Sequence, residues 1–222
     1  MSNYKFKGNA FKYNRVGYYR GKAEDIMLGC YGSKRSSMNN GTYLDVGNKL
    51  PVTAMDNVQI HTYGPIAIDW SKVAKGDLAL SGTVKYIKGD GAKADLSHSS
   101  AAMANLVLMK FIIYRDQLRD AVNDHAPKAL SSLASGSDGR LVSAIWVAME
   151  GRFATEVTTE GRVEFAASQQ GFDIKIKAGK SSTVKSTVTI GTNSTFAYML
   201  HKVVKWGSRK KVIEKLKDDP HG

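Results

Sequence analysis

Apolar and polar residues alternate in three consecutive segments between Arg162 and Ile190, each about as long as a β-strand. A side-chain period of two puts alternate residues on opposite faces of a strand, so each segment has one dry face and one wet face. The three apolar rows are Val163, Phe165 and Ala167; Phe172, Ile174, Ile176 and Ala178; and Val184, Val188 and Ile190. Glycine-bearing breaks at residues 170–171 and 179–180 are suited to hairpin turns. The pattern predicts an antiparallel meander over residues 162–190.

Several other segments also have the composition of strands. Residues 105–114 are dense in Leu, Val, Phe and Ile and predict a buried central strand, a composition that a buried helix shares. Residues 141–149 are apolar on both faces, which predicts an inner strand, and Gly151 is expected to form a bulge or turn before residues 153–158. The other predicted strands are residues 42–46, 57–63, 65–70, 77–88 (with a turn at 88–91) and 195–206.

The period changes to 3.6 residues after Arg115, where Leu118, Ala121 and Val122 fall on one side. This spacing predicts an internal helix, which Pro127 then interrupts because proline cannot continue a helix interior. Residues 128–134 are expected to form a second short helix.

A last helix is predicted over residues 209–218, with Ser208 as its N-cap and Pro220 after its end. Its apolar side would be Val212, Ile213 and Leu216, and its remaining surface would be mainly Lys and Arg. Such a helix is basic and amphipathic, and it is expected to dock on the sheet.

The chain has 222 residues, a length that suits one well-cored domain. The predicted elements indicate an α+β fold: a single domain with a twisted, mainly antiparallel sheet, an internal helix and a C-terminal basic helix. We divide the chain into a basic and aromatic amino-terminal arm at 1–37, an antiparallel α+β core at 38–206, and the carboxy-terminal helix and tail at 207–222.

Cysteine usage and the lack of targeting signals suggest a cytoplasmic protein. Cys30 is the only cysteine, so no internal disulfide can form. No apolar segment follows a basic start at the amino terminus, as a secretory signal would require. The longest apolar run, residues 101–114, has 14 residues, whereas a membrane-spanning helix needs about 20. These features favour a reducing, cytosolic setting.

The net charge of +12 is concentrated at the two ends of the chain. Residues 1–37 and 202–217 each carry a net +6, and the rest of the chain carries none. This distribution favours an anionic partner such as nucleic acid, phospholipid headgroups or an acidic protein, although a basic surface can also serve solubility alone. The candidate anion-binding residues are Lys5, Lys7, Lys12, Arg15, Arg20, Lys205, Arg209, Lys210 and Lys211.

Aromatic residues interleave with these cations in the amino-terminal arm. Tyr13, Tyr18 and Tyr19 could stack on unpaired bases while the cations follow the backbone, as in single-strand binders. The same composition suits a membrane interface, where rings lie at headgroup level and cations meet anionic lipid. It also suits a strand or arm packed on the body of the protein. The sequence leaves these three interpretations open.

Residues capable of catalysis or metal binding do not form a recognisable motif. Residues 97–99, Ser-His-Ser, could supply a serine nucleophile and a histidine base. Adjacent residues on a strand point to opposite faces, however, so the two groups would not meet. Asp116, Asp120 and Asp124 share a helical face, and with His125 they are one candidate set of ligands for a divalent cation. A solvated face balanced by neighbouring arginines explains them better. We therefore expect no catalytic residue, no metal and no cofactor.

The order of elements from about Leu78 onward resembles a known family. A strongly apolar strand at 105–114 is followed by a helix at 115–130, by the amphipathic hairpin strands of 162–190 and by the strand that begins Thr195-Phe196-Ala197-Tyr198-Met199-Leu200. This order is similar to that of the pore-forming domain of gasdermins, particularly the short bacterial ones.

The resemblance implies a non-enzymatic, membrane-acting and pore-forming protein that binds anionic lipid and forms a homo-oligomer. Gasdermins insert their hairpins into the membrane as a large barrel after an inhibitory carboxy-terminal segment is removed, which implies movement from cytoplasm to membrane. The residues it would place in the membrane hairpins are Val163, Phe165, Phe172, Ile174, Ile176, Val184, Val188 and Ile190. A spanning β-strand needs about 9–11 alternating residues, but half-buried strands of soluble sheets share that pattern.

Two other functions fit the same sequence. A basic nucleic-acid-binding protein would use the aromatic and basic amino terminus together with the Lys-rich carboxy terminus. A structural or interaction protein of a phage or host-defence system would need neither activity.

Overall fold

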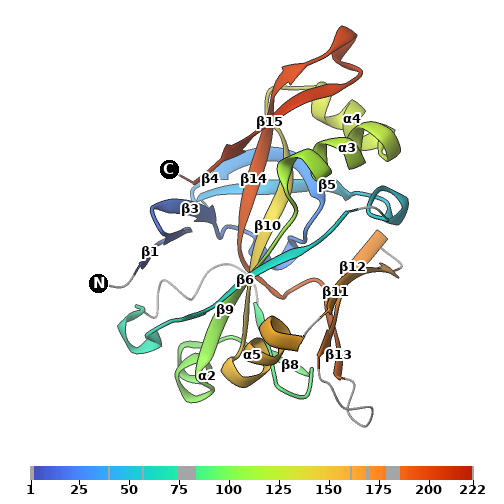
Figure 1. The fold of residues 1–222 in the computed structure, drawn as a ribbon. Helices are drawn as coiled ribbons and strands as arrows, with labels where there is room; N and C mark the ends of the chain where they lie inside the picture. The colour runs from blue at the N-terminus through green and yellow to red at the C-terminus, as the bar shows by residue number, and fades with distance from the viewer. Residues whose placement is uncertain are drawn as a thin grey trace.

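The computed structural model describes residues 3–39, 41–56, 58–74, 84–160, 162–168, 171–178 and 186–221. Within these residues, twelve strands form one large sheet and three strands form a second (Figure 1). The strands of the large sheet are β1 (Tyr4–Lys7), β2 (Ala10–Tyr13), β3 (Val16–Tyr19), β4 (Cys30–Ser37), β5 (Gly41–Lys49), β6 (His61–Ala67), β7 (Lys85–Ile87), β8 (Lys93–Asp95), β9 (Leu106–Ile112), β10 (Gly139–Glu150), β14 (Thr195–Trp206) and β15 (Ile213–Asp219). The second sheet contains β11 (Arg162–Ser168), β12 (Gly171–Ala178) and β13 (Ser186–Ile190).

The large sheet is built around two long central strands, β10 and β14. Its main path runs β1-β2-β3-β14-β10-β4-β5, and β15 pairs with β14, β9 pairs with β10 and β6 pairs with β9. All of these pairings are antiparallel, whereas β7 meets β10 in parallel. The α+β fold with a mainly antiparallel sheet is therefore confirmed.

The helices of the described residues are α2 (His98–Met103), α3 (Arg115–His125), α4 (Pro127–Ala134) and α5 (Gly151–Glu160). The predicted internal helix is α3, and Pro127 begins α4, a position where its missing N–H is tolerated. In Figure 1, α3 and α4 lie beside the β14–β15 hairpin. Asn123 on α3 fixes this contact, because its side chain donates to the carbonyl of Ile213 at 2.9 Å and accepts from its N–H at 2.8 Å.

The core has two parts because the central strands are buried on both faces. On β10, Ile145 and Val147 belong to one apolar cluster, whereas Trp146 and Ala148 belong to the other. The first cluster also contains residues of α3, α4, the second sheet and β15. Burial of both faces explains why β10 has a continuous apolar run in the sequence and no alternation.

The predicted meander is confirmed. Its strands β11, β12 and β13 pair antiparallel in sequence order, and Ile176 lies opposite both Val163 and Val188. Ile174 likewise lies between Phe165 and Ile190. The strands predicted at 42–46, 105–114, 141–149 and 195–206 are also present, as β5, β9, β10 and β14.

Two predictions were wrong in detail, and a third can be compared only in part. Gly151 is the first residue of α5, whose buried residues Phe153, Ala154 and Val157 follow the helical period. The two strands expected around Gly64-Pro65 are a single strand, β6, which passes through that dipeptide with a register shift opposite β9. Only the end of the strand predicted at 77–88 can be compared, as β7, because residues 75–83 lie outside the described part of the chain.

The carboxy-terminal helix predicted over 209–218 was also wrong. A short 3-10 turn at Ser208–Lys210 leads into the strand β15, which pairs with β14. Ile213 and Leu216 are buried as expected, but Val212 is 47% exposed. The pairing contains register shifts near Lys205, so buried positions on β15 recur after three residues, as they would on a helix.

Candidate anion-binding surfaces

The ends of β14 and β15 form a projecting basic hairpin, residues 202–217. In Figure 1 it extends beyond α3 and α4 at the top of the molecule. Its tip is closed by a hydrogen bond from the N–H of Gly207 to the carbonyl of Val212 (2.8 Å), and Trp206 pairs with Ile213 just before it. The cations of this hairpin are Lys202, Lys205, Arg209, Lys210, Lys211, Lys215 and Lys217.

Like charges face each other across the two strands of this basic hairpin. Lys202 lies opposite Lys217, and Lys205 lies opposite Lys215. Directly opposed like charges destabilise an antiparallel pair. Glu214 relieves part of the repulsion through a 2.5 Å ion pair with Lys205. The hairpin still carries a large positive excess, because Glu214 is the only acidic residue in 202–217.

Apolar side chains are exposed among these cations. Val204 is 44% exposed and Val212 is 47% exposed. Trp206, on the same hairpin, is partly exposed and also packs against the first core cluster. A tryptophan with lysines and aliphatic residues on one projection is a composition that suits the boundary between water and lipid. The helical spacing in the sequence predicted a buried Val212, so this combination was not expected.

A second basic surface lies on the amino-terminal strands. Lys5 on β1 is directly opposite Lys12 on β2, another pair of facing like charges. A shallow hollow of about 460 Å³ is lined by Asn3, Tyr4, Lys5, Lys12, Asn14 and Arg15. Asn14 and Arg15 form the turn between β2 and β3, with φ of 47° and 69°.

The other predicted anion-binding residues are placed differently. Lys7 is exposed at the end of β1, and Arg209 and Lys211 are exposed at the tip of the basic hairpin. Arg20 is only 4% exposed, and its guanidinium lies 4.5 Å from the ring centroid of Phe196. Arg20 therefore packs in the core as a cation–π partner. The side chain of Lys210 is outside the description.

The aromatic side chains proposed for base stacking are mostly inside the protein. Tyr18 is 4% exposed and Tyr19 is 2% exposed. Burial raises the pKa of Tyr18 to about 12. Tyr13 is half-buried with its ring 5.3 Å from that of Trp146. The sequence could not distinguish stacking rings from packed rings, and the structure packs Tyr18 and Tyr19 because β3 joins the central sheet at Tyr198.

The apolar row of the meander covers the core. Ile174, Ile176, Val188 and Ile190 are each at most 1% exposed, and Val163 and Phe165 are half-buried against the same cluster. On the opposite face, polar side chains reach water, and Lys177 pairs with Glu164 at 2.6 Å. Phe172 lies on β12, but its side chain is outside the description, as is the whole of Val184. The alternating apolar residues of the meander are therefore buried against the core in this structure.

A buried ion cluster was not detected in the sequence. Asp219 on β15 accepts hydrogen bonds from Arg140 at 2.6 Å and from Lys34 at 2.7 Å. Burial alone would raise the pKa of Asp219, but these two hydrogen bonds and the accompanying charges outweigh it and hold the pKa below its usual value. Lys34 and Asp219 are 185 residues apart in the chain, so no local signal announces the contact.

The Ser97 cluster and the aspartates of α3, which the sequence raised as candidate catalytic and metal-binding groups, make structural contacts. Ser97 caps α2 by accepting a hydrogen bond from the N–H of Ser100. Asp116 and Asp120 pair with Arg119 at 3.1 and 2.8 Å on the exposed face of α3. Among the described residues, no group of three His, Cys, Asp or Glu side chains is placed to hold a metal ion.

Comparisons of this chain with protein-family models, with curated proteins and with solved structures found no match. In the part of the chain that the structure describes, no helix has both the length and the apolar composition needed to cross a membrane.

Proposed function

We propose that this protein binds an anionic membrane surface through its basic hairpin, residues 202–217. The observation that carries the proposal is the combination at one projecting point of opposed lysine pairs with the exposed Val204 and Val212 and the partly exposed Trp206. Facing lysines repel one another in water, and an anionic surface would attract both side chains and offset the repulsion between them. Each Lys or Arg near such a surface contributes about 1 kcal/mol. The apolar side chains add a contact that a purely electrostatic partner would not use.

A second step of this proposal concerns the meander. In the described residues, β11, β12 and β13 hydrogen-bond with one another and not with the large sheet. Release of the meander from the body of the protein would therefore break apolar packing, but it would break no pairing between strands of the two sheets. Burial of each Ile or Val of the meander stabilises the fold by about 1.5–3 kcal/mol. Contact of the same apolar side chains with lipid would offset the loss of this stabilisation. Gasdermins, whose order of elements this chain resembles, act on membranes in this way.

Duplex nucleic acid is the second candidate partner. A projecting two-stranded ribbon fits the major groove of DNA, where β-ribbon proteins read base edges, and the lysines of the basic hairpin would meet phosphates. Binding of single strands by stacking has less support, because Tyr18 and Tyr19 are buried.

Co-sedimentation of the full chain with vesicles tests the proposal. We expect binding to vesicles that contain phosphatidylserine, little binding to pure phosphatidylcholine, and a decrease between 50 and about 300 mM salt as screening grows. The triple variant Arg209→Gln, Lys211→Gln, Lys215→Gln should weaken binding by about 100-fold, since three cations each contribute about 1 kcal/mol. The charge-matched control is Lys72→Gln, Lys88→Gln, Arg152→Gln, which should bind as wild type.

Two further measurements separate the alternatives. Dye release from the same vesicles reports the second step, and binding without release would limit the proposal to surface attachment. Gel-shift titration with a duplex and a single strand reports the nucleic-acid function. Duplex binding that is lost in the hairpin variant, without any vesicle binding by the wild type, would overturn the membrane proposal.

A further inference from the structure

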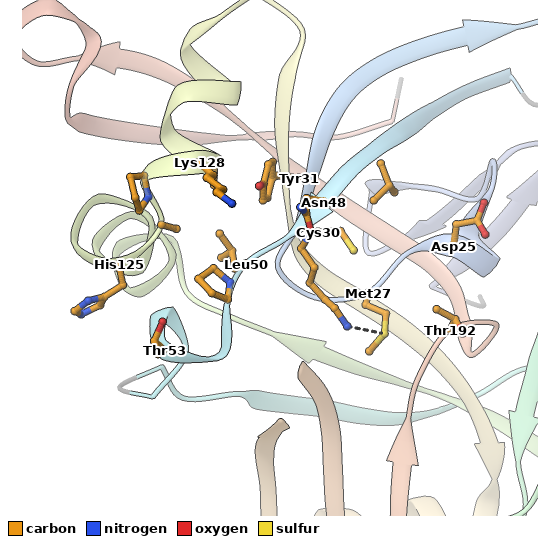
Figure 2. Close-up of a pocket in the computed structure, with 16 residues that line it drawn as sticks. Asp25, Met27, Cys30, Tyr31, Asn48, Leu50, Thr53, His125, Lys128 and Thr192 are labelled. Atoms are coloured by element: carbon orange, nitrogen blue, oxygen red, sulfur yellow. Dashed lines mark hydrogen bonds between the residues drawn. The ribbon is translucent and has the colours of Figure 1, made fainter. Parts of the chain in front are cut away.

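A cavity of about 800 Å³ lies between the β4–β5 strands and the junction of α3 with α4 (Figure 2). Ligand pockets commonly have volumes of about 300–1,000 Å³, so this one is large enough for a small organic molecule. It is far in sequence from the basic hairpin and from the meander strands, apart from Thr192 in the connection that follows β13. The function proposed above does not use it.

The inner wall of this cavity is apolar. Met27, Cys30, Leu50 and Ala129 line it, and each is at most 4% exposed. Burial raises the pKa of the Cys30 thiol, which favours the neutral form. Burial likewise raises the pKa of Tyr31, so its phenol also lines the cavity as a neutral group. An uncharged wall of this kind favours an apolar ligand body.

Among the described residues that line the same cavity, lysines outnumber carboxylates. Lys49 and Lys128 line it, whereas Asp25 is the one carboxylate among its lining residues. The Lys49 side chain is 9% exposed, and its ammonium lies 3.8 Å from the Asp173 carboxylate and 3.7 Å from the sulfur of Met27. Lys128 forms no ion pair within the described part of the chain, and Figure 2 shows its side chain extending from α4 towards Tyr31.

We propose that this cavity binds a small apolar monocarboxylate. The apolar body of the ligand would lie against Met27, Cys30 and Leu50, and its carboxylate would pair with Lys128 at the mouth of the cavity. Charge decides the class of ligand: a cation would meet the lysines, and a neutral molecule would leave Lys128 unused. A partly desolvated, charge-assisted hydrogen bond is stronger than a neutral one, so the carboxylate sets the affinity. A single charge suffices, because Asp173 already lies near Lys49.

Equilibrium dialysis of the full chain with radiolabelled decanoate, below its micelle concentration, tests this proposal. We expect saturable one-to-one binding, with decanol and decylamine at least about fivefold weaker because they lack the carboxylate. Lys128→Gln should weaken decanoate binding about tenfold, since Lys128 is exposed on α4 and the variant will fold. Lys72→Gln is the matched control and should bind decanoate as wild type does.

A pair of variants at Cys30 locates the ligand. Cys30→Met extends a longer side chain into the cavity and should weaken decanoate binding at least about fivefold, whereas the isosteric Cys30→Ser should retain it. Equal affinity of wild type for decanoate and decanol, or equal affinity of Lys128→Gln and Lys72→Gln, would overturn the proposal even if Cys30→Met fails to fold. Tighter binding of decyl phosphate than of decanoate would also overturn it in favour of a phosphate head. No vesicle is present, so a failed membrane proposal would leave these results unaffected.

Discussion

Tyr198 illustrates how a single hydroxyl joins distant parts of this fold. It lies on β14, is fully buried, donates to the carbonyl of Gly21 at 2.8 Å and accepts from the N–H of Leu44 at 2.9 Å. Burial raises the pKa of this phenol, so it remains protonated and able to donate. One side chain thereby satisfies a backbone carbonyl in the connection after β3 and a backbone N–H on β5.

We expect Tyr198→Phe to lower the free energy of unfolding by about 1–3 kcal/mol, because it leaves a buried N–H and a buried carbonyl without their partner. Urea denaturation measures this change. Tyr114→Phe is the control, since the Tyr114 hydroxyl bonds to Tyr63 at an exposed position and its loss should shift the midpoint little. Equal midpoints for the two variants would contradict this role for Tyr198.

His201 gives the stability of this protein a pH dependence. The ring is 3% exposed, and burial lowers its pKa although Nε2 lies 2.7 Å from the Asp218 carboxylate, a contact that acts in the opposite direction. The unfolded chain therefore takes up the proton at a higher pH than the folded chain, close to the unperturbed pKa of about 6.5. The contribution of His201 to the free energy of unfolding therefore decreases as the pH falls below about 7.

In His201→Gln, the decrease in the free energy of unfolding between pH 7.5 and pH 5 should become smaller than in wild type. Urea titrations at half-unit pH intervals measure it. His221, whose pKa burial also lowers, keeps part of the effect in the variant. A variant with the same pH dependence as wild type would show that His201 is protonated alike in both states.

At the scale of elements, β15 is held at both ends of its length. Asn123 on α3 fixes its start at Ile213, and the ion cluster of Asp219 with Arg140 and Lys34 fixes its end. The side chains of Asp219 and Arg140 are 12% and 9% exposed, so the two charges are largely desolvated. Removing one member of such a pair leaves the other without compensation.

Asp219→Asn should therefore lower the free energy of unfolding by about 3 kcal/mol at pH 7. The depressed pKa of Asp219 means that its contribution is present at neutral pH and is lost as the pH falls through that pKa, so wild type and variant should converge in acid. Urea denaturation at pH 7 and in acid measures both. Asp69→Asn removes an exposed carboxylate next to Lys72 and should leave the stability nearly unchanged; an equal loss in both variants would contradict the argument.

At the scale of the whole molecule, segments from across the chain share one core. Tyr19 from the amino-terminal strands, Ile176 from the meander and Leu216 from β15 belong to the same apolar cluster. The carboxy-terminal end also contacts the amino-terminal strands directly, because the N–H of His221 donates to the carbonyl of Gly17 at 3.1 Å. Such shared burial couples the segments into one cooperative unit.

Deletion of residues 207–222 should therefore abolish cooperative unfolding. It removes Ile213 and Leu216, each contributing about 1.5–3 kcal/mol by burial, together with the Asp219 cluster, from a domain whose total stability is about 5–15 kcal/mol. Circular dichroism during thermal unfolding and light scattering at 25 °C measure the outcome. A folded truncation that newly permeabilises vesicles would instead show that this segment restrains the meander.

The sequence by itself determined the elements whose side chains repeat with the local backbone period. The meander and α3 were predictable because alternation or a 3.6-residue spacing depends only on which face of the element is buried. The strands β9 and β14 were predictable from their dense apolar composition. The concentration of positive charge at the two chain ends and the single cysteine also follow directly from the sequence. The lysines and arginines of the basic hairpin were singled out in this way as candidate anion-binding residues, but their paired arrangement across two strands was not predicted.

Only the tertiary structure decided what depends on contacts between distant segments. The bulged pairing of β15 with β14 gives Ile213 and Leu216 a spacing of three, which mimics a helix until the partner strand is known. Because β3 pairs with β14, Tyr18 and Tyr19, which were candidate base-stacking rings, are buried in the core. The cavity beside Cys30 and the Asp219 cluster likewise join residues far apart in the chain, and local periodicity contains no information about such pairs.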